Sequence, residues 1–399
     1  MFWFWFFVGP ALALAIFALR GERRRARWVE ERLAGDPDDP TPPATVIVTL
    51  DGIAFDGPQE HLRENLAALA SQDYPNYELL VTARTASHIP PDSLPPRVTV
   101  VLGGAQDEKA TIRIQNLMAG VRAARKRSEI LAFADPAGRV STNWLRALVA
   151  PLADPEVGAS TGYRFYVPEP PDFWSLARSV WDAPIGGLLG PGDNPFAWSG
   201  SLAIRKERFY ELQVPGAWRG TRSEDGALTH AIHQAQRKIA FAPGALLAYT
   251  GRTGARQFFS QAQRQMAMAR AWFPRLWWSA LAAHVFYCGG MAAAVTASVR
   301  GSRGAEWALV VQLGLGMLKG INRAALAKAE LPDREAWFKR HAWVHSLWVP
   351  LGTWVWLFVL LSSVFIRTGE NDPRRQDVPR ASKRTRKSLV RRGVIASII

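Results

Sequence analysis

The feature that most constrains this chain is the presence of long apolar runs at both of its ends. The first run extends from Phe2 to Leu19 without a charged residue. Basic residues follow it at once: Arg20, Arg23, Arg24, Arg25 and Arg27. A cleaved signal peptide would carry its positive charge before the apolar run, which is the reverse of the order here. The sequence therefore predicts an uncleaved N-terminal membrane anchor over residues 1–27, with the chain that follows it in the cytoplasm.

Two further apolar runs lie late in the chain, from Leu276 to Val299 and from Trp343 to Ile366, and neither contains Asp, Glu, Lys or Arg. Each is long enough to cross a bilayer with some tilt. Between them, the apolar stretch from Trp307 to Leu318 is short, so it is expected to be interfacial, re-entrant or packed against the other helices. The sequence therefore predicts C-terminal membrane helices within residues 271–369.

The basic residues of the C-terminal region complicate the membrane topology. Residues 370–399 are predicted to be a disordered cytoplasmic tail that is attracted to anionic lipid headgroups. Spans at 276–299 and 343–366 would return this tail to the cytoplasm. They would also place several basic residues outside: Arg300, Arg303, Arg323, Lys339 and Arg340. Because the positive-inside rule disfavours that arrangement, one apparent span could instead lie flat on the cytoplasmic surface, and the sequence does not indicate which one.

The charge of the whole chain favours an anionic partner. The formal net charge is +15, which suits a phosphate-bearing substrate or an anionic lipid surface. Nucleic acid is disfavoured, because no aromatic residues interleave with the basic ones and no nucleic-acid motif accompanies them. Cys288 is the only cysteine, which excludes an internal disulfide framework and a cysteine-based metal site.

The residues between the two membrane regions have the pattern of an α/β domain. A linker is predicted over residues 28–43 and the domain itself over residues 44–270. Short β-branched runs alternate with helical patterns, which predicts a mainly parallel sheet flanked by helices. The expected elements are strands at 44–50, 77–82, 98–102 and 130–134 and helices at 61–71 and 112–125. Ligands of such sheets collect at the carboxyl ends of the strands, which is where Asp51 and Asp135 lie.

Several segments of this chain stand in an order that is typical of a known family: 65–81 (NLAALASQDYPNYELLV), 114–120 (IQNLMAG), 130–140 (ILAFADPAGRV), 198–209 (WSGSLAIRKERF), 223–232 (SEDGALTHAI) and 258–265 (FFSQAQRQ). With apolar helices at both ends, the chain resembles a family 2-type inverting glycosyltransferase. The resemblance is strongest to membrane-bound ceramide glucosyltransferases and their bacterial relatives. It implies an α/β GT-A domain with a mainly parallel sheet, plus N-terminal and C-terminal transmembrane helices.

The resemblance implies catalytic and metal-binding residues. Asp135 resembles the leading aspartate of the DxD-type motif of the family, which would hold Mg²⁺ or Mn²⁺ against the diphosphate of a nucleotide-sugar donor. Asp225, with Glu224 beside it, resembles the general base that removes the proton of the acceptor hydroxyl. Both assignments have a plainer alternative. Asp135 could be a simple turn former before Pro136, and the two acids could cap a helix that begins after Ser223.

Further residues are implied to bind the donor. Asp51 or Asp56 would help to hold the nucleoside, and Arg113 and Asn116 stand where the family has a Lys and an Asn near the donor. Gln261 and Arg264 resemble the Gln-x-x-Arg-Trp motif, in which the guanidinium would clamp phosphate oxygens. Arg264 could alternatively be a snorkelling residue on an amphipathic helix.

Three positions depart from the pattern of the family. The second acid of the DxD-type motif is absent from Asp135-Pro136-Ala137, the acid expected after the strand at 77–82 is absent, and the tryptophan of the last motif is Gln265. We therefore consider two functions. The first is a membrane-anchored inverting glycosyltransferase at the cytoplasmic face that moves a sugar from a nucleotide-diphosphate donor to a lipid hydroxyl. The alternative is a catalytically decayed domain that acts as a membrane scaffold or regulator.

Overall fold

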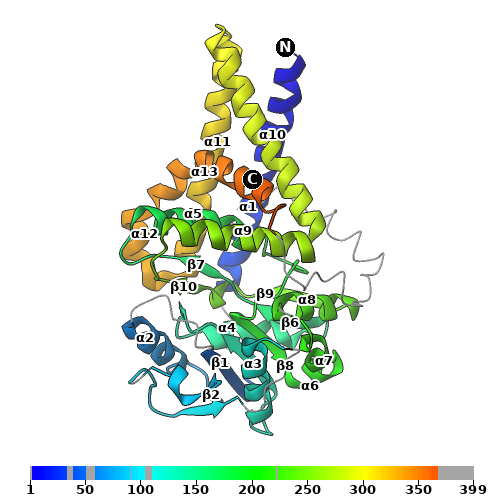
Figure 1. Ribbon diagram of the computed structural model, residues 1–399, viewed down its shortest axis with the longest axis vertical. Coiled ribbons are helices and arrows are strands. Elements are labelled where there is room, and N and C mark those ends of the chain that lie inside the picture. Colours follow the sequence, from blue (N-terminus) through cyan, green and yellow to red (C-terminus); the bar gives the residue numbers. More distant parts are fainter. Residues whose placement is uncertain are drawn as a thin grey trace.

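The computed structural model describes residues 2–33, 39–50, 59–90, 92–103, 110–221 and 223–366 (Figure 1). The predicted nucleoside-binding residues Asp51 and Asp56, and the predicted basic tail at 370–399, lie outside the described residues. The described chain forms an α/β domain built on a central sheet, from which a group of long helices extends to one side.

The central sheet has seven strands in the order β3-β2-β1-β4-β8-β6-β9. Their bounds are β1 Ala44–Leu50, β2 Tyr77–Ala83, β3 Val98–Leu102, β4 Ile130–Ala134, β6 Val157–Thr161, β8 Ser201–Arg205 and β9 Lys238–Phe241. All neighbouring pairs are parallel except the two that involve β8. The four strands predicted from the sequence are therefore present, and the predicted mainly parallel sheet is confirmed.

The alternation of side chains in β1 explains how the sheet is covered on both faces. All seven residues of β1 are buried, as expected for a central strand of a parallel sheet. Val46 and Val48 pack into one core with Leu62 and Leu66, whereas Ile47 packs into a second core on the opposite face. The helices that cover the sheet and its edges are α2 Gln59–Ala70, α3 Ile112–Ala123, α4 Trp144–Val149, α6 Lys206–Glu211, α7 Val214–Trp218 and α8 Glu224–Gln234.

A small second sheet lies between the central sheet and the long helices, in the order β5-β10-β7. Its strands are β5 Gly138–Arg139, β10 Leu247–Tyr249 and β7 Arg164–Tyr166. The parallel register of β10 and β7 pairs Tyr249 with Tyr166. Two helices, α5 Phe173–Gly186 and α9 Ala255–Trp272, lie above this sheet, on the side of the long helices (Figure 1).

Three long helices pack along one another and extend away from the α/β domain: α1 Phe2–Leu33, α10 Pro274–Val299 and α11 Arg303–Glu330 (Figure 1). The helix α1 continues past the predicted anchor boundary at residue 27, through the first part of the predicted linker. Its basic end is held by the rest of the chain, because Arg25 contacts Glu330 at 3.3 Å and Glu22 contacts Arg323 at 3.0 Å. Within the predicted linker, Trp28 stacks on Phe241 of β9 at a centroid distance of 6.2 Å and Val29 is buried, so packing against the α/β domain stabilises helix where the sequence suggested a connecting segment.

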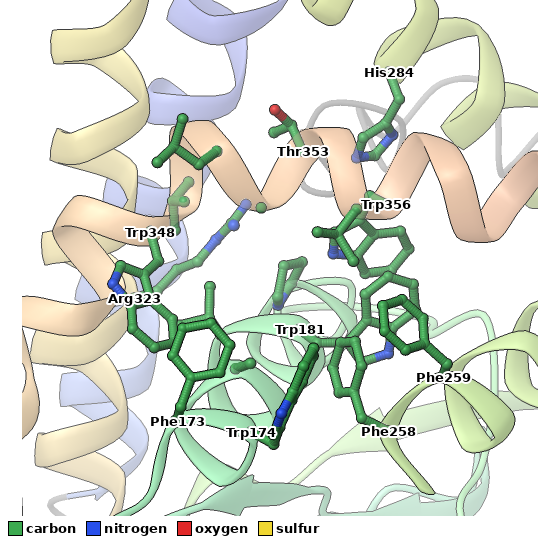
Figure 2. Close-up of a pocket in the computed structure, with 17 residues that line it drawn as sticks. Phe173, Trp174, Trp181, Phe258, Phe259, His284, Arg323, Trp348, Thr353 and Trp356 are labelled. Atoms are coloured by element: carbon green, nitrogen blue, oxygen red, sulfur yellow. The ribbon is translucent and has the colours of Figure 1, made fainter. Parts of the chain in front are cut away.

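The remaining C-terminal helices are α12 Glu335–His341 and α13 Trp343–Ser362. By length and composition, three helices of the described residues are able to cross a membrane: Phe4–Leu33, Pro274–Val299 and Trp343–Ser362. This agrees with the three predicted apolar runs. The helix α13 nevertheless runs across the direction of α1 and α11 (Figures 1 and 2). The short apolar stretch at 307–318 lies inside α11, which is packed against α1, α10 and α13, one of the three arrangements expected for it.

Candidate active site

The turn that precedes β8 brings together two aspartates that are far apart in the sequence. The backbone N–H of Ser199 donates a hydrogen bond to the Oδ1 atom of Asp225 at 2.6 Å. The backbone N–H of Asp135 donates to the carbonyl oxygen of Gly200 at 2.8 Å. Asp135 directly follows β4, and Asp225 lies in the first turn of α8. The same short turn is therefore bonded to the backbone of the predicted metal ligand and to the carboxyl of the predicted general base.

The side chain of Glu224 is held in a polar network beside Asp225. The Nε atom of Arg113 lies 2.6 Å from Oε1 of Glu224, and the Ser199 hydroxyl donates to the same oxygen at 3.1 Å. Arg113 also donates from its NH1 atom to the hydroxyl of Thr49 at 3.1 Å. Since Thr49 lies near the end of β1, this network joins α3 and α8 across the carboxyl edge of the sheet.

The predicted helix cap is also present. Ser223 is the N-cap of α8, and its side chain accepts a hydrogen bond from the backbone N–H of Gly226 at 3.1 Å. The first turn of a helix favours negative charge, because its unpaired N–H groups give the end a partial positive charge. A capping role and a catalytic role are therefore compatible: the cap positions Glu224 and Asp225 in the first turn of α8, and the polar network orients their side chains.

The environment of Asp225 raises the pKa of its carboxyl group into the neutral range. Burial, followed by the nearby negative charge of Glu224, raises the pKa of Asp225 to about 7. The hydrogen bonds from Ser199 and the charge of Arg113 act in the opposite direction and lower it. A carboxyl group with such a pKa can accept a proton close to physiological pH, which is the property that general-base catalysis requires.

Asp135 forms a turn and lies beside an aromatic residue, Tyr249. Its Oδ1 atom accepts a hydrogen bond from the backbone N–H of Ala137 at 2.9 Å, as in the predicted turn. Asn65 donates to the carbonyl oxygen of Pro136 at 3.0 Å and so fixes that turn. Burial and the nearby charge of Asp135 raise the pKa of the Tyr249 hydroxyl well above its usual value. The carboxyl group therefore lies at the edge of the aromatic layer formed by β7 and β10.

The donor atoms around Asp135 fit a cation that arrives with a phosphate ligand. Among the described residues there is no group of three or more His, Cys, Asp and Glu side chains that could hold a metal ion. Asp135 is a single, partly exposed carboxylate, because the second acid of the motif is Ala137. Mg²⁺ is commonly bound through one or two carboxylates together with water and substrate phosphates. Asp135 is thus compatible with a divalent cation that is shared with a diphosphate.

Asn116 lies on the same helix as Arg113 and faces the end of β3. The Asn116 side chain is buried, and a Cβ atom added to Gly103 would lie 2.7 Å from its Oδ1 atom. Gly103 itself donates its N–H to the carbonyl oxygen of Ala83, the last residue of β2, at 2.7 Å. Arg113 and Asn116 are therefore both at the carboxyl edge of the sheet, as the donor-binding prediction requires.

The two residues of the last predicted motif have different surroundings. The Oε1 atom of Gln261 accepts a short hydrogen bond from Arg178 of α5. Arg178 also donates to the hydroxyl of Tyr166 at 3.1 Å, and the Tyr166 ring lies 5.2 Å from that of Tyr249. By contrast, Arg264 is exposed and has no hydrogen bond or ion pair within the described part of the chain. The structure links Gln261, and not Arg264, to the surroundings of Asp135.

Sequence reasoning missed an arginine cage that supports this site. The guanidinium of Arg164 binds the buried carboxyl of Asp182 through two contacts of 3.1 and 3.3 Å. Aromatic rings surround it at 5.4 to 5.8 Å: Tyr163, Tyr166, Trp198 and Tyr249. Such contacts favour a cation over an aromatic face. Trp198 directly precedes Ser199 and Gly200, which form the hydrogen bonds to Asp225 and Asp135. The contact between Arg164 and the Trp198 ring therefore helps to fix the position of this turn. No local motif marks the cage, since its members come from four separate segments.

Comparisons with known proteins agree with the sequence-based resemblance. Residues 4–175 match the profile of glycosyl transferase family 21. A search of curated proteins finds no significant match. The family match, together with the order of the central sheet, confirms the predicted GT-A class of fold and the predicted glycosyltransferase class of enzyme.

Solved structures to which this chain is similar include two that are in complex with a sugar nucleotide and Mn²⁺. One is the mannosyltransferase PcManGT from Pyrobaculum calidifontis in complex with GDP-Man and Mn²⁺, at 18% identity and a TM-score of 0.38, over 88% of this chain and 99% of that one. Another is glucosyl-3-phosphoglycerate synthase from Mycobacterium tuberculosis with Mn²⁺ and UDP-glucose, at 14% identity and a TM-score of 0.37, over 61% of this chain and 82% of that one.

Proposed function

We propose that this membrane-associated glycosyltransferase, which matches family 21 over residues 4–175, moves a sugar from a nucleotide-diphosphate donor to the hydroxyl of a membrane lipid with inversion. The observation that carries the proposal is the position of Asp225. Its carboxyl has a pKa near neutrality, is oriented by Ser199, and lies next to the Glu224–Arg113 pair at the edge of the sheet. The same domain is continuous with apolar helices at both ends.

The mechanism follows from the chemistry of Asp225. As the acceptor oxygen attacks the anomeric carbon, the bond to the leaving diphosphate breaks on the opposite face, so the configuration inverts. The ionised carboxylate of Asp225 accepts the hydroxyl proton, which keeps the attacking oxygen from becoming positively charged. Arg113 and Glu224 act as positioning residues, because their network fixes the first turn of α8 relative to the sheet.

The donor end of the site requires positive charge. A divalent cation, Mg²⁺ or Mn²⁺, would neutralise the charge that develops on the leaving diphosphate. Asp135 is the described residue that would hold it, and Arg113 and Asn116 lie at the same edge for the rest of the donor. Gln261 reaches this edge through Arg178 and Tyr166, while the proposed roles of Asp51, Asp56 and Arg264 rest on the family resemblance.

The arrangement of the long helices supports a multi-pass protein with a cytoplasmic active site. We take α1 and α10 as spanning helices together with α11, which is not one of the three described helices that qualify by length and composition but runs beside these two. We take α13 as the apparent span that lies flat (Figure 1). Only the short connection at 300–303 would then carry arginines to the outer side. Arg323, Lys339, Arg340 and the tail would be cytoplasmic, in better agreement with the positive-inside rule than spans at 276–299 and 343–366. The tail would face the anionic lipid headgroups proposed as its partner.

The test is transfer by the purified protein in lipid vesicles, with a panel of sugar nucleotides, hydroxyl-bearing lipids, and Mg²⁺ or Mn²⁺. We expect a glycosylated lipid with inverted anomeric configuration, and no product after chelation of the cation. The replacement of the second motif acid by Ala137 keeps the scaffold alternative open. Folded protein that neither binds a sugar nucleotide in the presence of cation nor glycosylates a lipid would refute the transferase proposal and favour the scaffold.

A further inference from the structure

An apolar chamber lies where the α/β domain meets the membrane helices. Its volume is about 300 Å³, and it is enclosed by α5 and α9 on the side of the domain and by α13 on the other side (Figure 2). Aromatic side chains from these helices dominate its wall: Trp174, Trp181, Phe258, Phe259, Trp348 and Trp356. None of these residues takes part in the polar network around Asp225.

The chamber has an exposed end and a closed end. Phe173 and Leu351 line it and are 59% and 64% exposed, respectively. Trp181 and Trp356 line it as well, but are only 3% and 6% exposed, and their rings stack at a centroid distance of 4.0 Å. The chamber is therefore accessible from the surface at Phe173 and Leu351 and is closed by the tryptophan pair.

The occupant that fits this chamber is a hydrocarbon chain. An apolar wall offers water too few hydrogen bonds for stable filling. Arg323 also lines the chamber, but its Nε atom forms an ion pair with Oε1 of Glu22 at 3.0 Å. Because this charge is balanced, the chamber does not require an anionic ligand. The outer side of α13 exposes Leu347, Leu361 and Phe358, which suits contact with lipid. The chains available at such a surface are those of membrane lipids.

The chamber and the candidate active site share two helices. On α5, Trp174 and Trp181 face the chamber, whereas Arg178 reaches Gln261 and the Tyr166 hydroxyl on the side of Asp135. On α9, Phe258 and Phe259 face the chamber, and Gln261 faces Arg178. We propose that the chamber holds one hydrocarbon chain of the acceptor lipid, so that the headgroup hydroxyl is presented at the α5–α9 edge of the active site. This inference rests on the proposed function.

Gly352 provides a direct test, because it lines the chamber on α13. A Cβ atom at this position would meet only the Cγ1 atom of Val180, at 3.9 Å, which is an ordinary contact. The variant Gly352→Leu should thus fill part of the chamber without disturbing the helix backbone. Gly314→Leu is the matched control, since Gly314 is an exposed residue of α11 with nothing within 4 Å of its added Cβ. Ala177→Leu, on the opposite wall, is a second filling variant.

The measurement is the KM for hydroxyl lipids that differ only in chain length, such as diacylglycerols with two palmitoyl or two hexanoyl chains. Loss of the space for about two methylene groups corresponds to roughly a tenfold rise in KM. We expect this rise for the palmitoyl acceptors with Gly352→Leu and Ala177→Leu, and no change for the hexanoyl acceptors or for the donor. Gly314→Leu should behave as wild type with every acceptor.

A second measurement does not depend on turnover. A lipid with a diazirine at the end of its acyl chain, carried in phosphatidylcholine vesicles, should label α5 and α13 on illumination, and less so in Gly352→Leu. Lipid transfer by wild type with no chain-length difference between Gly352→Leu and Gly314→Leu would overturn the chamber proposal and leave the proposed function intact. Labelling of the chamber without transfer to any lipid would refute the proposed function and the acceptor role together.

Discussion

The candidate active site and the apolar chamber are connected through α5 and α9, and they are held together in different ways. At the site, Arg113, Ser199 and Glu224 are connected by directional hydrogen bonds. In the chamber, Trp181 and Trp356 are held by stacking. Directional contacts depend on single atoms, whereas stacked aromatic rings depend on shape and buried area. We therefore expect the first region to fail when one atom is exchanged, and the second to respond in proportion to the volume changed.

The strongest test of this contrast is Asp225→Asn, which exchanges one oxygen for a nitrogen and keeps the shape. The variant cannot accept the proton of the acceptor hydroxyl, so we expect a loss of about 10²- to 10⁴-fold in kcat with little change in KM for the donor. The measurement is sugar transfer to lipid under saturating donor.

Asp73→Asn is the matched control for Asp225→Asn, because the Asp73 side chain is 72% exposed and lies in the turn after α2. It should retain wild-type activity, and both variants should unfold at the temperature of the wild type. Full activity in Asp225→Asn would contradict the assignment of the general base.

The second test addresses the packing of α13, which forms one wall of the chamber. A Cβ atom on Gly320 of α11 would overlap the backbone carbonyl oxygen of His345 at the start of α13. The variant Gly320→Ala must therefore displace α13, and overpacking of this kind costs about 1 to 3 kcal/mol. We expect a lower unfolding temperature in detergent and weaker use of long-chain acceptors.

Gly314→Ala is the control for Gly320→Ala, since a Cβ atom at that position meets nothing within 4 Å. It should be neutral or slightly stabilising, because alanine favours a helix interior over glycine. If both variants had the same unfolding temperature, the close approach of α11 and α13 would be wrong.

The two regions also differ in how far the sequence predicts them. The strand at 44–50 and the acids Asp135 and Asp225 are predictable, because a β-branched run and a strand-end or helix-start acid are local signals. The pairing of Arg113 with Glu224 and of Arg178 with Gln261 joins distant segments, and no local pattern encodes it. Hydropathy reports the composition of α13 and not its direction, so the chamber beneath it could not be predicted either.

The third test concerns the charge of Glu224. Since Glu224 raises the pKa of Asp225, the variant Glu224→Gln should lower that pKa while keeping an oxygen for Arg113 and Ser199. In wild type, kcat/KM should rise with pH through about 7, as Asp225 loses its proton. In Glu224→Gln this rise should move to lower pH, by on the order of one unit. Glu207→Gln, at an exposed residue of α6, is the control and should leave the pH dependence of kcat/KM unchanged. If the rise of kcat/KM in Glu224→Gln stayed at the wild-type pH, the titrating group that controls the rate would not be Asp225.

The smallest expected effect is at Gln265, where the family pattern has a tryptophan. Its Oε1 atom accepts a hydrogen bond from the indole N–H of Trp181 at 3.2 Å, so Gln265 joins α9 to the closed end of the chamber. The variant Gln265→Met should lose about 1 kcal/mol of stability and leave the pH dependence of catalysis unaltered. It should raise the KM for a palmitoyl acceptor about fivefold, because the loosened Trp181 no longer closes the chamber firmly.

Gln263→Met separates the contribution of the chamber to the Gln265 effect from that of general stability. Gln263 is on the same helix and also makes one hydrogen bond to another helix, from Nε2 to the Ser362 hydroxyl at 3.0 Å, but neither residue lines the chamber. The two variants should therefore have similar unfolding temperatures, and only Gln265→Met should discriminate against long chains. If the ratio of the palmitoyl KM to the hexanoyl KM stayed at its wild-type value in both variants, Trp181 would contribute only to the stability of the fold, and the two regions would be mechanically independent.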